Sequence, residues 1–152
     1  MTIGVRAIIK DKDSIIMVSH NEKDHGHLLL FPGGGIEKGE SIFQAAEREV
    51  LEETHLLVEA KSIAYMREVA YKGEFGIEIY VLCDLRDGEL KLGHDPEHDE
   101  NNQVLTGVER IPIVELNNHD WKPEELRDLL QADLEAGINI GSMKYLGLRT
   151  LG

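Results

Sequence analysis

The sequence predicts an α/β fold in which a mixed β-sheet lies between helices. Apolar segments typical of strands stand on both sides of one amphipathic helix, and a second helical pattern follows near the C-terminus. The chain has 152 residues, of which 41% are hydrophobic and 30% are charged. This size and composition predict a single globular domain over residues 1–152.

The first part of the chain is predicted to deliver a glycine-rich loop. Apolar runs over Ile3–Lys10 and Ile15–Val18 flank a polar turn, which is the pattern of a hairpin. A charged loop follows that contains three histidines, His20, His25 and His27. A short buried strand over Leu28–Phe31 then leads into the Pro32–Gly35 loop, where three consecutive glycines permit a close approach of the backbone to a ligand.

A helix is predicted to begin after Ser41. Ser41 and Gln44 have the S-x-x-Q spacing of a capping box, which satisfies backbone N–H groups at a helix start. Phe43, Ala46 and Val50 then form an apolar stripe. The helix therefore packs on a sheet through this stripe and presents its other side chains to a cleft.

Three carboxylates gather on one face of this helix. Glu49, Glu52 and Glu53 stand at positions i, i+3 and i+4, within about 100° of one another around the axis. Like charges at this spacing repel, but hard divalent ions such as Mg²⁺ prefer oxygen ligands and reverse the sign of the interaction. The pattern indicates a cation site.

The stretch from Gly34 to Leu56 resembles the box of the Nudix hydrolase family, which is MutT-like and has the pattern G-x5-E-x7-R-E-U-x-E-E-x-G-U, with U a bulky apolar residue. Eight positions match: Gly34, Glu40, Arg48, Glu49, Val50, Glu52, Glu53 and Leu56. The departure is His55, where the pattern has a glycine just past the helix end. That position often takes the left-handed conformation, which histidine tolerates better than most residues.

The resemblance implies an α/β/α sandwich and Mg²⁺-dependent hydrolysis of the diphosphate linkage in a nucleoside diphosphate joined to another group, with Mn²⁺ as a substitute ion. Nucleoside triphosphates, ADP-ribose, nucleotide sugars and dinucleoside polyphosphates all remain open as substrates. The implied metal site consists of Glu49, Glu52, Glu53 and Gly34. A non-catalytic, nucleotide-sensing Nudix-like module is the alternative, and the intact carboxylates argue against it.

The resemblance also implies roles in catalysis. Arg48 is expected to orient a box glutamate by bidentate hydrogen bonding, since its guanidinium is a rigid fork of donors. The general base is either a box glutamate, Glu53 or Glu52, or an acidic residue on the loop at 94–103, for which Glu100 is the first choice.

Four residues are expected to contact the substrate. Gly34 and Gly35 shape the loop beside the diphosphate. Phe31 and Tyr71 are candidates to stack on a base, as is Tyr80, with core packing as the alternative for each.

The second half of the chain is predicted to complete the sheet. A long strand over Leu56–Tyr71 pairs antiparallel with the strand that contains Cys83, whose thiol is expected to be buried and structural. After the acidic loop, a strand is expected over Val104–Val114 and a helix over Glu124–Glu135. The tail, Ile138–Gly152, is consistent with an edge strand or with contacts in a homodimer.

Charge and hydropathy narrow the function classes. The net charge of -13, without a run of Lys or Arg, argues against binding of a nucleic-acid duplex. No apolar run reaches the roughly 18 residues of a membrane span, and the N-terminal stretch lacks the pattern of a signal peptide. These features predict a cytoplasmic protein, and the family resemblance implies a small nucleoside diphosphate derivative as its partner.

Overall fold

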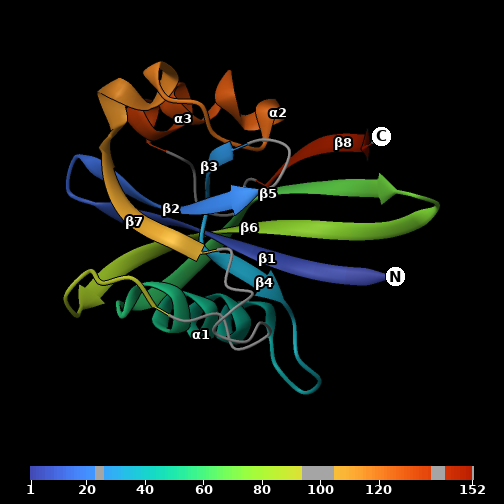
Figure 1. The fold of residues 1–152 in the computed structure, drawn as a ribbon, viewed down its shortest axis with the longest axis horizontal. Coiled ribbons are helices and arrows are strands. Elements are labelled where there is room, and N and C mark those ends of the chain that lie inside the picture. Colours follow the sequence, from blue (N-terminus) through green and yellow to red (C-terminus); the bar gives the residue numbers. More distant parts are fainter. Residues whose placement is uncertain (23–25, 94–104, 138–142, 152) are drawn as a thin grey trace.

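A computed structural model describes residues 1–22, 26–93, 105–137 and 143–151. One mixed sheet lies between helices on its two faces, which confirms the predicted α/β/α sandwich (Figure 1). The elements in chain order are β1 (Thr2–Asp11), β2 (Ser14–Glu22), β3 (Gly26–Leu30), β4 (Gly33–Gly35), α1 (Ile42–Thr54), β5 (Leu57–Tyr71), β6 (Glu74–Asp87), β7 (Leu105–Pro112), η1 (Ile113–Asn118), α2 (Glu124–Arg127), α3 (Leu130–Ala136) and β8 (Lys144–Leu151). None of these helices is long and apolar enough to cross a membrane.

The sheet has the strand order β3-β2-β1-β6-β5-β8, with β4 paired to β1 and β7 paired to β2. The antiparallel hairpins β1–β2 and β5–β6 confirm the two pairings that the sequence predicts. β1 also runs parallel to β6, and β5 runs parallel to β8. These parallel pairs join segments that are far apart in the chain.

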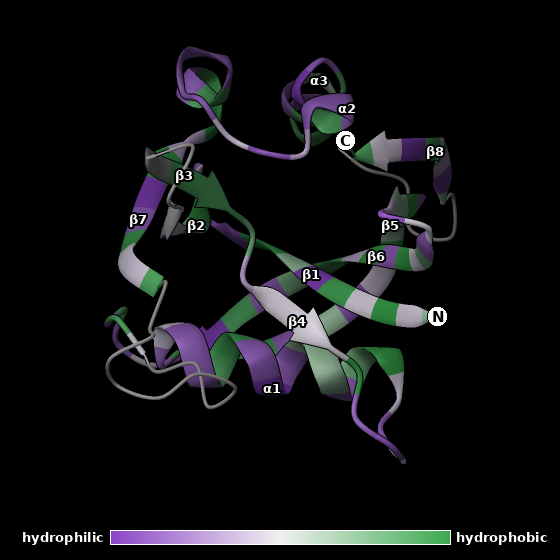
Figure 2. Cartoon of the chain, turned by 45° about the vertical axis from the view of Figure 1, so that its right-hand side comes forward, coloured by the Kyte–Doolittle hydropathy of each residue, from purple (hydrophilic) through white to green (hydrophobic). Residues whose placement is uncertain are grey.

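Each face of the sheet has its own hydrophobic core, because successive side chains of a strand point to opposite faces. Val5, Ala7 and Ile9 of β1 pack with the apolar stripe of α1. Ile8, between them, packs in the second core, together with residues of η1, α2 and α3. Figure 2 shows this alternation of apolar and polar residues along β1 and β6.

Two segments before α1 differ from expectation. The predicted Pro32–Gly35 loop forms a short strand, β4, because glycine lets the two backbones approach: a Cβ on Gly33 would stand 2.0 Å from the carbonyl oxygen of Val5. The predicted histidine loop is mostly strand, since His20 lies in β2 and His27 in β3, which pair antiparallel. His25 lies outside the described residues.

The C-terminal part also differs in detail. The strand predicted to run to Val114 ends at Pro112, which has no N–H to continue the ladder, and η1 follows. The predicted helix over Glu124–Glu135 is two short helices, because the amide of Leu129 bonds the carbonyl of Leu126, three residues back, and tightens the turn between them. The tail forms the edge strand β8, one of its two expected roles.

Cys83 lies in β6 with no exposed surface. Burial raises the pKa of its thiol to about 12. The predicted burial of the thiol is therefore confirmed, and its raised pKa disfavours the reactive thiolate.

Candidate active site

α1 has the ends that its sequence predicts. The Ser41 hydroxyl accepts a hydrogen bond from the Gln44 amide at 3.1 Å, and the Gln44 side chain accepts one from the Ser41 amide at 2.9 Å. His55 caps the other end with φ 63° and ψ 11°, the left-handed conformation expected where the family pattern has glycine. Because both ends of α1 are capped, the position of the acidic face along the helix axis is fixed.

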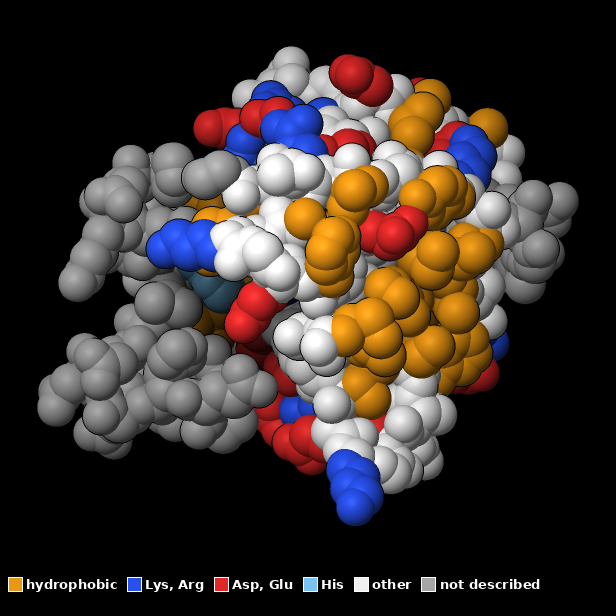
Figure 3. All heavy atoms as spheres, turned by 90° about the vertical axis from the view of Figure 1, so that its right-hand side faces the viewer, with side chains coloured by type: hydrophobic (Ala, Val, Ile, Leu, Met, Phe, Trp, Pro, Cys, Tyr) orange, Lys and Arg blue, Asp and Glu red, His pale blue; other side chains and the backbone are white. Residues whose placement is uncertain are grey.

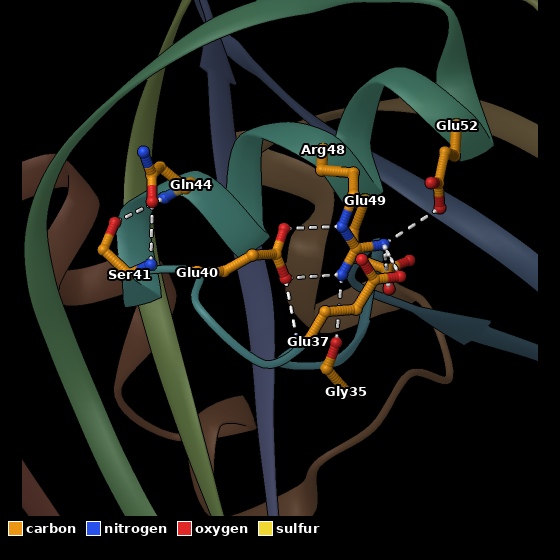
Figure 4. A network of polar contacts seen from close by, with 8 residues as sticks. All are labelled: Gly35, Glu37, Glu40, Ser41, Gln44, Arg48, Glu49 and Glu52. Atoms are coloured by element: carbon orange, nitrogen blue, oxygen red, sulfur yellow. Dashed lines mark hydrogen bonds and ion pairs between the residues drawn. The ribbon is translucent and has the colours of Figure 1, made fainter.

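Arg48 is the centre of a polar cluster on α1 (Figure 4). Its Nε and Nη2 donate to the two carboxylate oxygens of Glu40 at 2.7 and 3.0 Å. Its Nη1 donates to Glu49 at 3.1 Å and to Glu52 at 3.2 Å, and Nη2 also donates to the carbonyl of Gly35. One guanidinium therefore ties the loop before α1 to two carboxylates of its acidic face.

The bidentate contact is charge-assisted and changes the acidity of both partners. The hydrogen bonds from Arg48 hold the pKa of Glu40 below its ordinary value. The same contact raises the pKa of Arg48 further above its usual range. Glu40 also accepts from the Glu37 amide at 2.8 Å, so it braces the loop that leads into α1.

β4 lies against the acidic face of α1. The Gly33 amide donates to Oε2 of Glu53 at 3.2 Å. A Cβ on Gly34 would stand 2.4 Å from Oε1 of Glu49. Only a glycine leaves room for the Glu49 carboxylate at this position, so the glycine run of the sequence is explained by contact with these carboxylates rather than by a free loop.

The donor set of this site suits a hard divalent cation. Glu49 and Glu53 are 6% and 4% exposed, and Glu52 lies nearer the surface. Glu40, Glu49 and Glu52 together carry more negative charge than Arg48 neutralises. The atoms that they can offer to a metal ion are all oxygens, which Mg²⁺ prefers as ligands. Within the described residues, however, no three acidic, His or Cys side chains already converge on one point.

The segment after β6 closes the C-terminal end of α1. The amides of Lys91 and Gly93 donate to the carbonyls of Thr54 and Glu53, at 3.0 and 2.8 Å. A Cβ on Gly93 would stand 1.8 Å from the carbonyl oxygen of Glu52, so glycine is required. Gly93, the last described residue before Leu105, thus lies against the backbone of Glu52 and Glu53. Glu100 itself lies outside the described residues.

The aromatic candidates lie apart from the carboxylates. Phe31 and Tyr80 are 1% exposed and meet edge to face at 6.1 Å, and Phe31 meets Trp121 at 5.5 Å. Phe31 and Tyr80 are thus core residues, which was the alternative for each. Tyr71 is 48% exposed at the end of β5 that is remote from α1.

A cavity of about 480 Å³ lies on the other face of the sheet, beside α2. Arg6, Arg67, Lys122 and Arg149 contribute cations to its lining. Arg67 donates to Glu78 and Glu125 of the same network. The cavity therefore offers donors and acceptors beside the apolar side chains of Leu28, Leu30 and Leu151.

Gly33 connects this cavity to the acidic face. It pairs with Arg6 in the β1–β4 ladder, while its amide donates to Glu53. Arg6 in turn donates to the carbonyl of Phe31 at 3.2 Å. The cavity and the carboxylates thus lie on either side of one short strand.

Sequence reasoning missed the cavity residues and Gly93. The available signal was a charged residue inside an otherwise apolar strand: Arg6 stands between Val5 and Ala7, and Arg67 follows Met66. Such a residue either faces solvent or lines a polar cavity. The choice between the two depends on strand pairing, which the sequence does not reveal.

The fold and the site together define a class: an α/β/α protein with an acidic helix against a glycine strand. The model of the NUDIX domain family matches residues 1–130, most of the chain, so the chain belongs to this family. β8 lies beyond the matched residues.

Two curated relatives illustrate the range of related proteins. An ADP-ribose pyrophosphatase of Methanocaldococcus jannaschii is 30% identical over 100 residues, which are 64% of this chain and 59% of the relative. An NAD-capped RNA hydrolase NudC of Edwardsiella ictaluri is 32% identical over 89 residues, 59% of this chain and 33% of the relative. The chain thus matches only part of the length of each.

Solved structures share the fold over nearly the whole chain. A NUDIX hydrolase from Nitrosomonas europaea superposes with a TM-score of 0.72 at 21% identity and covers 91% of both chains. An ADP-ribose pyrophosphatase from Streptococcus suis gives 0.68 at 20% identity, over 95% of this chain and 98% of the other. The observed architecture is therefore that of the family.

Proposed function

We propose that this chain hydrolyses the diphosphate linkage of a nucleoside diphosphate joined to another group, with Mg²⁺ as the cofactor and Mn²⁺ as a substitute. The observation that carries the proposal is that Arg48 holds Glu49 and Glu52, while Gly33 donates to Glu53 and Gly34 lies directly against Glu49. ADP-ribose is the first candidate substrate, because a relative that is 30% identical is named an ADP-ribose pyrophosphatase.

Glu49, Glu52, Glu53 and the Gly34 backbone would hold the ion. When bound, it supplies positive charge to the diphosphate oxygens and makes a water molecule a better nucleophile. The protein's part is to hold these carboxylates in place. Arg48 does this by donating to Glu49 and Glu52 at once, while its other donors are anchored on Glu40.

A carboxylate must accept the proton of the attacking water. Glu53 and Glu52 of α1 are two candidates for this general base. Glu100 is the third, and Gly93, the last described residue before it, lies beside the carbonyls of Glu52 and Glu53.

The cavity beside α2 is the proposed site for the organic part of the substrate. Its position across β4 from the carboxylates allows one molecule to reach both, with the diphosphate passing the Gly33–Gly35 strand. The mixed lining of Arg67, Glu125 and Lys122 offers donors and acceptors to ribose hydroxyls or a base edge.

The test is a panel of ADP-ribose, nucleoside triphosphates, nucleotide sugars and dinucleoside polyphosphates, each assayed with Mg²⁺, with Mn²⁺ and with EDTA. We expect turnover of at least one compound that requires the ion, with two phosphate-bearing products. Binding of a nucleotide that stabilises the fold, without turnover of any compound, would instead identify a nucleotide sensor.

A further inference from the structure

The cavity beside α2 adjoins a smaller one. The smaller cavity has a volume of about 70 Å³ and shares Arg6, Arg67 and Lys122 with the larger one. Because the same side chains line both, the two cavities meet at a wall that carries cations.

Three of the cations at these cavities are held by carboxylates. The pairs are Arg67 with Glu78 and Glu125, Lys122 with Glu124, and Arg149 with Glu124 and Glu125. Figure 3 shows the same mixture of basic and acidic side chains at the top of the molecule, where α2 lies in Figure 1. Asp120, a further carboxylate of the lining, pairs with Arg127. The charges around α2 are therefore compensated within the chain.

Arg6 differs from these cations. It lies half-buried in β1, and its Nη1 donates to the carbonyl of Phe31 at 3.2 Å. Within the described residues, this is the one hydrogen bond of its guanidinium, and Arg6 forms no ion pair there. A guanidinium carries several N–H donors and is always charged. Arg6 therefore presents a charge and donors that the described part of the chain does not use.

The position of Arg6 relates it to the acidic face of α1. Arg6 pairs with Gly33 in the β1–β4 ladder, and a Cβ on Gly33 would stand 2.9 Å from Cδ of Arg6. The Gly33 amide in turn donates to Oε2 of Glu53 at 3.2 Å. The stem of Arg6 thus packs against the one strand that separates the cavity from the carboxylates.

The same contacts restrain the Arg6 side chain before any ligand binds. Gly33 confines its stem, and the carbonyl of Phe31 holds one end of its guanidinium. A guanidinium is a planar fork of donors that matches the oxygens of a phosphate group, and a restrained fork loses little entropy on binding. These features favour an anion with two oxygens side by side as the partner of Arg6.

We propose that Arg6 binds the phosphate group of the nucleoside monophosphate half of the substrate, through two parallel N–H···O hydrogen bonds, where that half enters the cavity. This assignment rests on the proposed function, which places the diphosphate at the acidic face and the organic part in the cavity. Arg6 then selects nucleotides over nucleosides by a contact that needs no metal ion.

The test is the binding of the four ribonucleoside 5′-monophosphates and of their nucleosides, measured by calorimetry in EDTA so that no metal ion contributes. For at least one pair, we expect wild type to bind the monophosphate about 10-fold or more tightly than the nucleoside, as a charge-assisted contact provides. Arg6→Met should bind both about equally, with its affinity for the nucleoside unchanged. Arg6→Lys should keep part of the preference, because it keeps the charge and loses the fork.

Arg110→Met is the matched control, because it removes a cation at a distance from the cavity. Arg110 lies in β7 and pairs with Asp11. It should bind the monophosphate and the nucleoside as wild type does. An equal loss of the preference in Arg110→Met and Arg6→Met would assign the effect to net charge and would overturn the proposal.

Three further results would overturn it. They are a wild type that prefers no monophosphate, a preference that survives in Arg6→Met, and an Arg6→Met variant that loses affinity for the nucleoside by the same factor. The fate of the proposed function is separate. Turnover in the substrate panel with an unaltered preference in Arg6→Met would leave hydrolysis in place and remove Arg6, whereas a preference that depends on Arg6 without turnover of any compound would do the reverse.

Discussion

At Gly34, the absence of a side chain determines where the Glu49 carboxylate lies. A Cβ there would stand 2.4 Å from Oε1 of Glu49, so Gly34→Ala must displace that carboxylate. The displaced atoms end a flexible side chain, and we therefore expect a small loss of stability. Turnover should fall by about 10- to 100-fold, because small displacements of site groups are costly. Steady-state kinetics together with thermal unfolding measure both effects.

Gly4→Ala is the matched control for this variant. Gly4 pairs with Gly35 in the same ladder, and a Cβ there would meet its nearest neighbour at an ordinary 3.7 Å. Equal turnover in the two variants would contradict a role for Glu49.

Glu40 links the site to the pH dependence of stability. Its hydrogen bonds from Arg48 hold its pKa in the folded protein below the ordinary 4.5. A carboxyl with a lowered pKa contributes stability that is present above its ordinary pKa and is lost as the pH falls through the folded value. At pH 7 we expect Glu40→Gln to be less stable than wild type by about 0.5–1 kcal/mol, since the pair is near the surface.

The stabilities of wild type and Glu40→Gln should converge as the pH falls below 4.5. Urea unfolding between pH 7 and pH 3 measures this difference, with Glu115→Gln as the control for removal of an exposed carboxylate on η1. A constant gap between wild type and Glu40→Gln over this range would refute the linkage.

α1 ends at His55, which has a backbone conformation that residues with a side chain rarely adopt. His55 has φ 63°, where a Cβ is strained and glycine is not. His55→Gly should therefore raise the melting temperature by about 1–2 °C, which corresponds to a gain of about 0.5 kcal/mol. His55→Ala keeps the Cβ and should show no such gain. A lower melting temperature in His55→Gly would mean that the imidazole contributes more than the strain costs.

The elements that the sequence predicted best are those specified by local signals. The capping box of Ser41 and Gln44 and the left-handed position of His55 depend on residues within one turn, and both are confirmed. β4 was missed because a strand of three glycines has no side-chain pattern. The break near Leu129 was missed because the spacing of the buried leucines fits one helix as well as two.

On the scale of the whole molecule, the parts that sequence could not give are those that depend on strand order. The parallel pairing of β1 with β6 and the position of β8 decide that Arg6, Arg67 and Arg149 line one cavity. They also decide which apolar residues remain uncovered. The family resemblance, by contrast, rested on the spacing within one short segment, and the NUDIX domain match over residues 1–130 confirms it.

The central claim is that Glu53 holds the ion that hydrolysis requires. The most direct measurement is the turnover of Glu53→Gln on the substrate found in the panel, with Mn²⁺ affinity measured by calorimetry on the same samples. We expect turnover about 100-fold or more below wild type and weaker Mn²⁺ binding, with Glu115→Gln unchanged in both. Near-normal turnover of Glu53→Gln with an unaltered dependence on the metal ion would contradict the account.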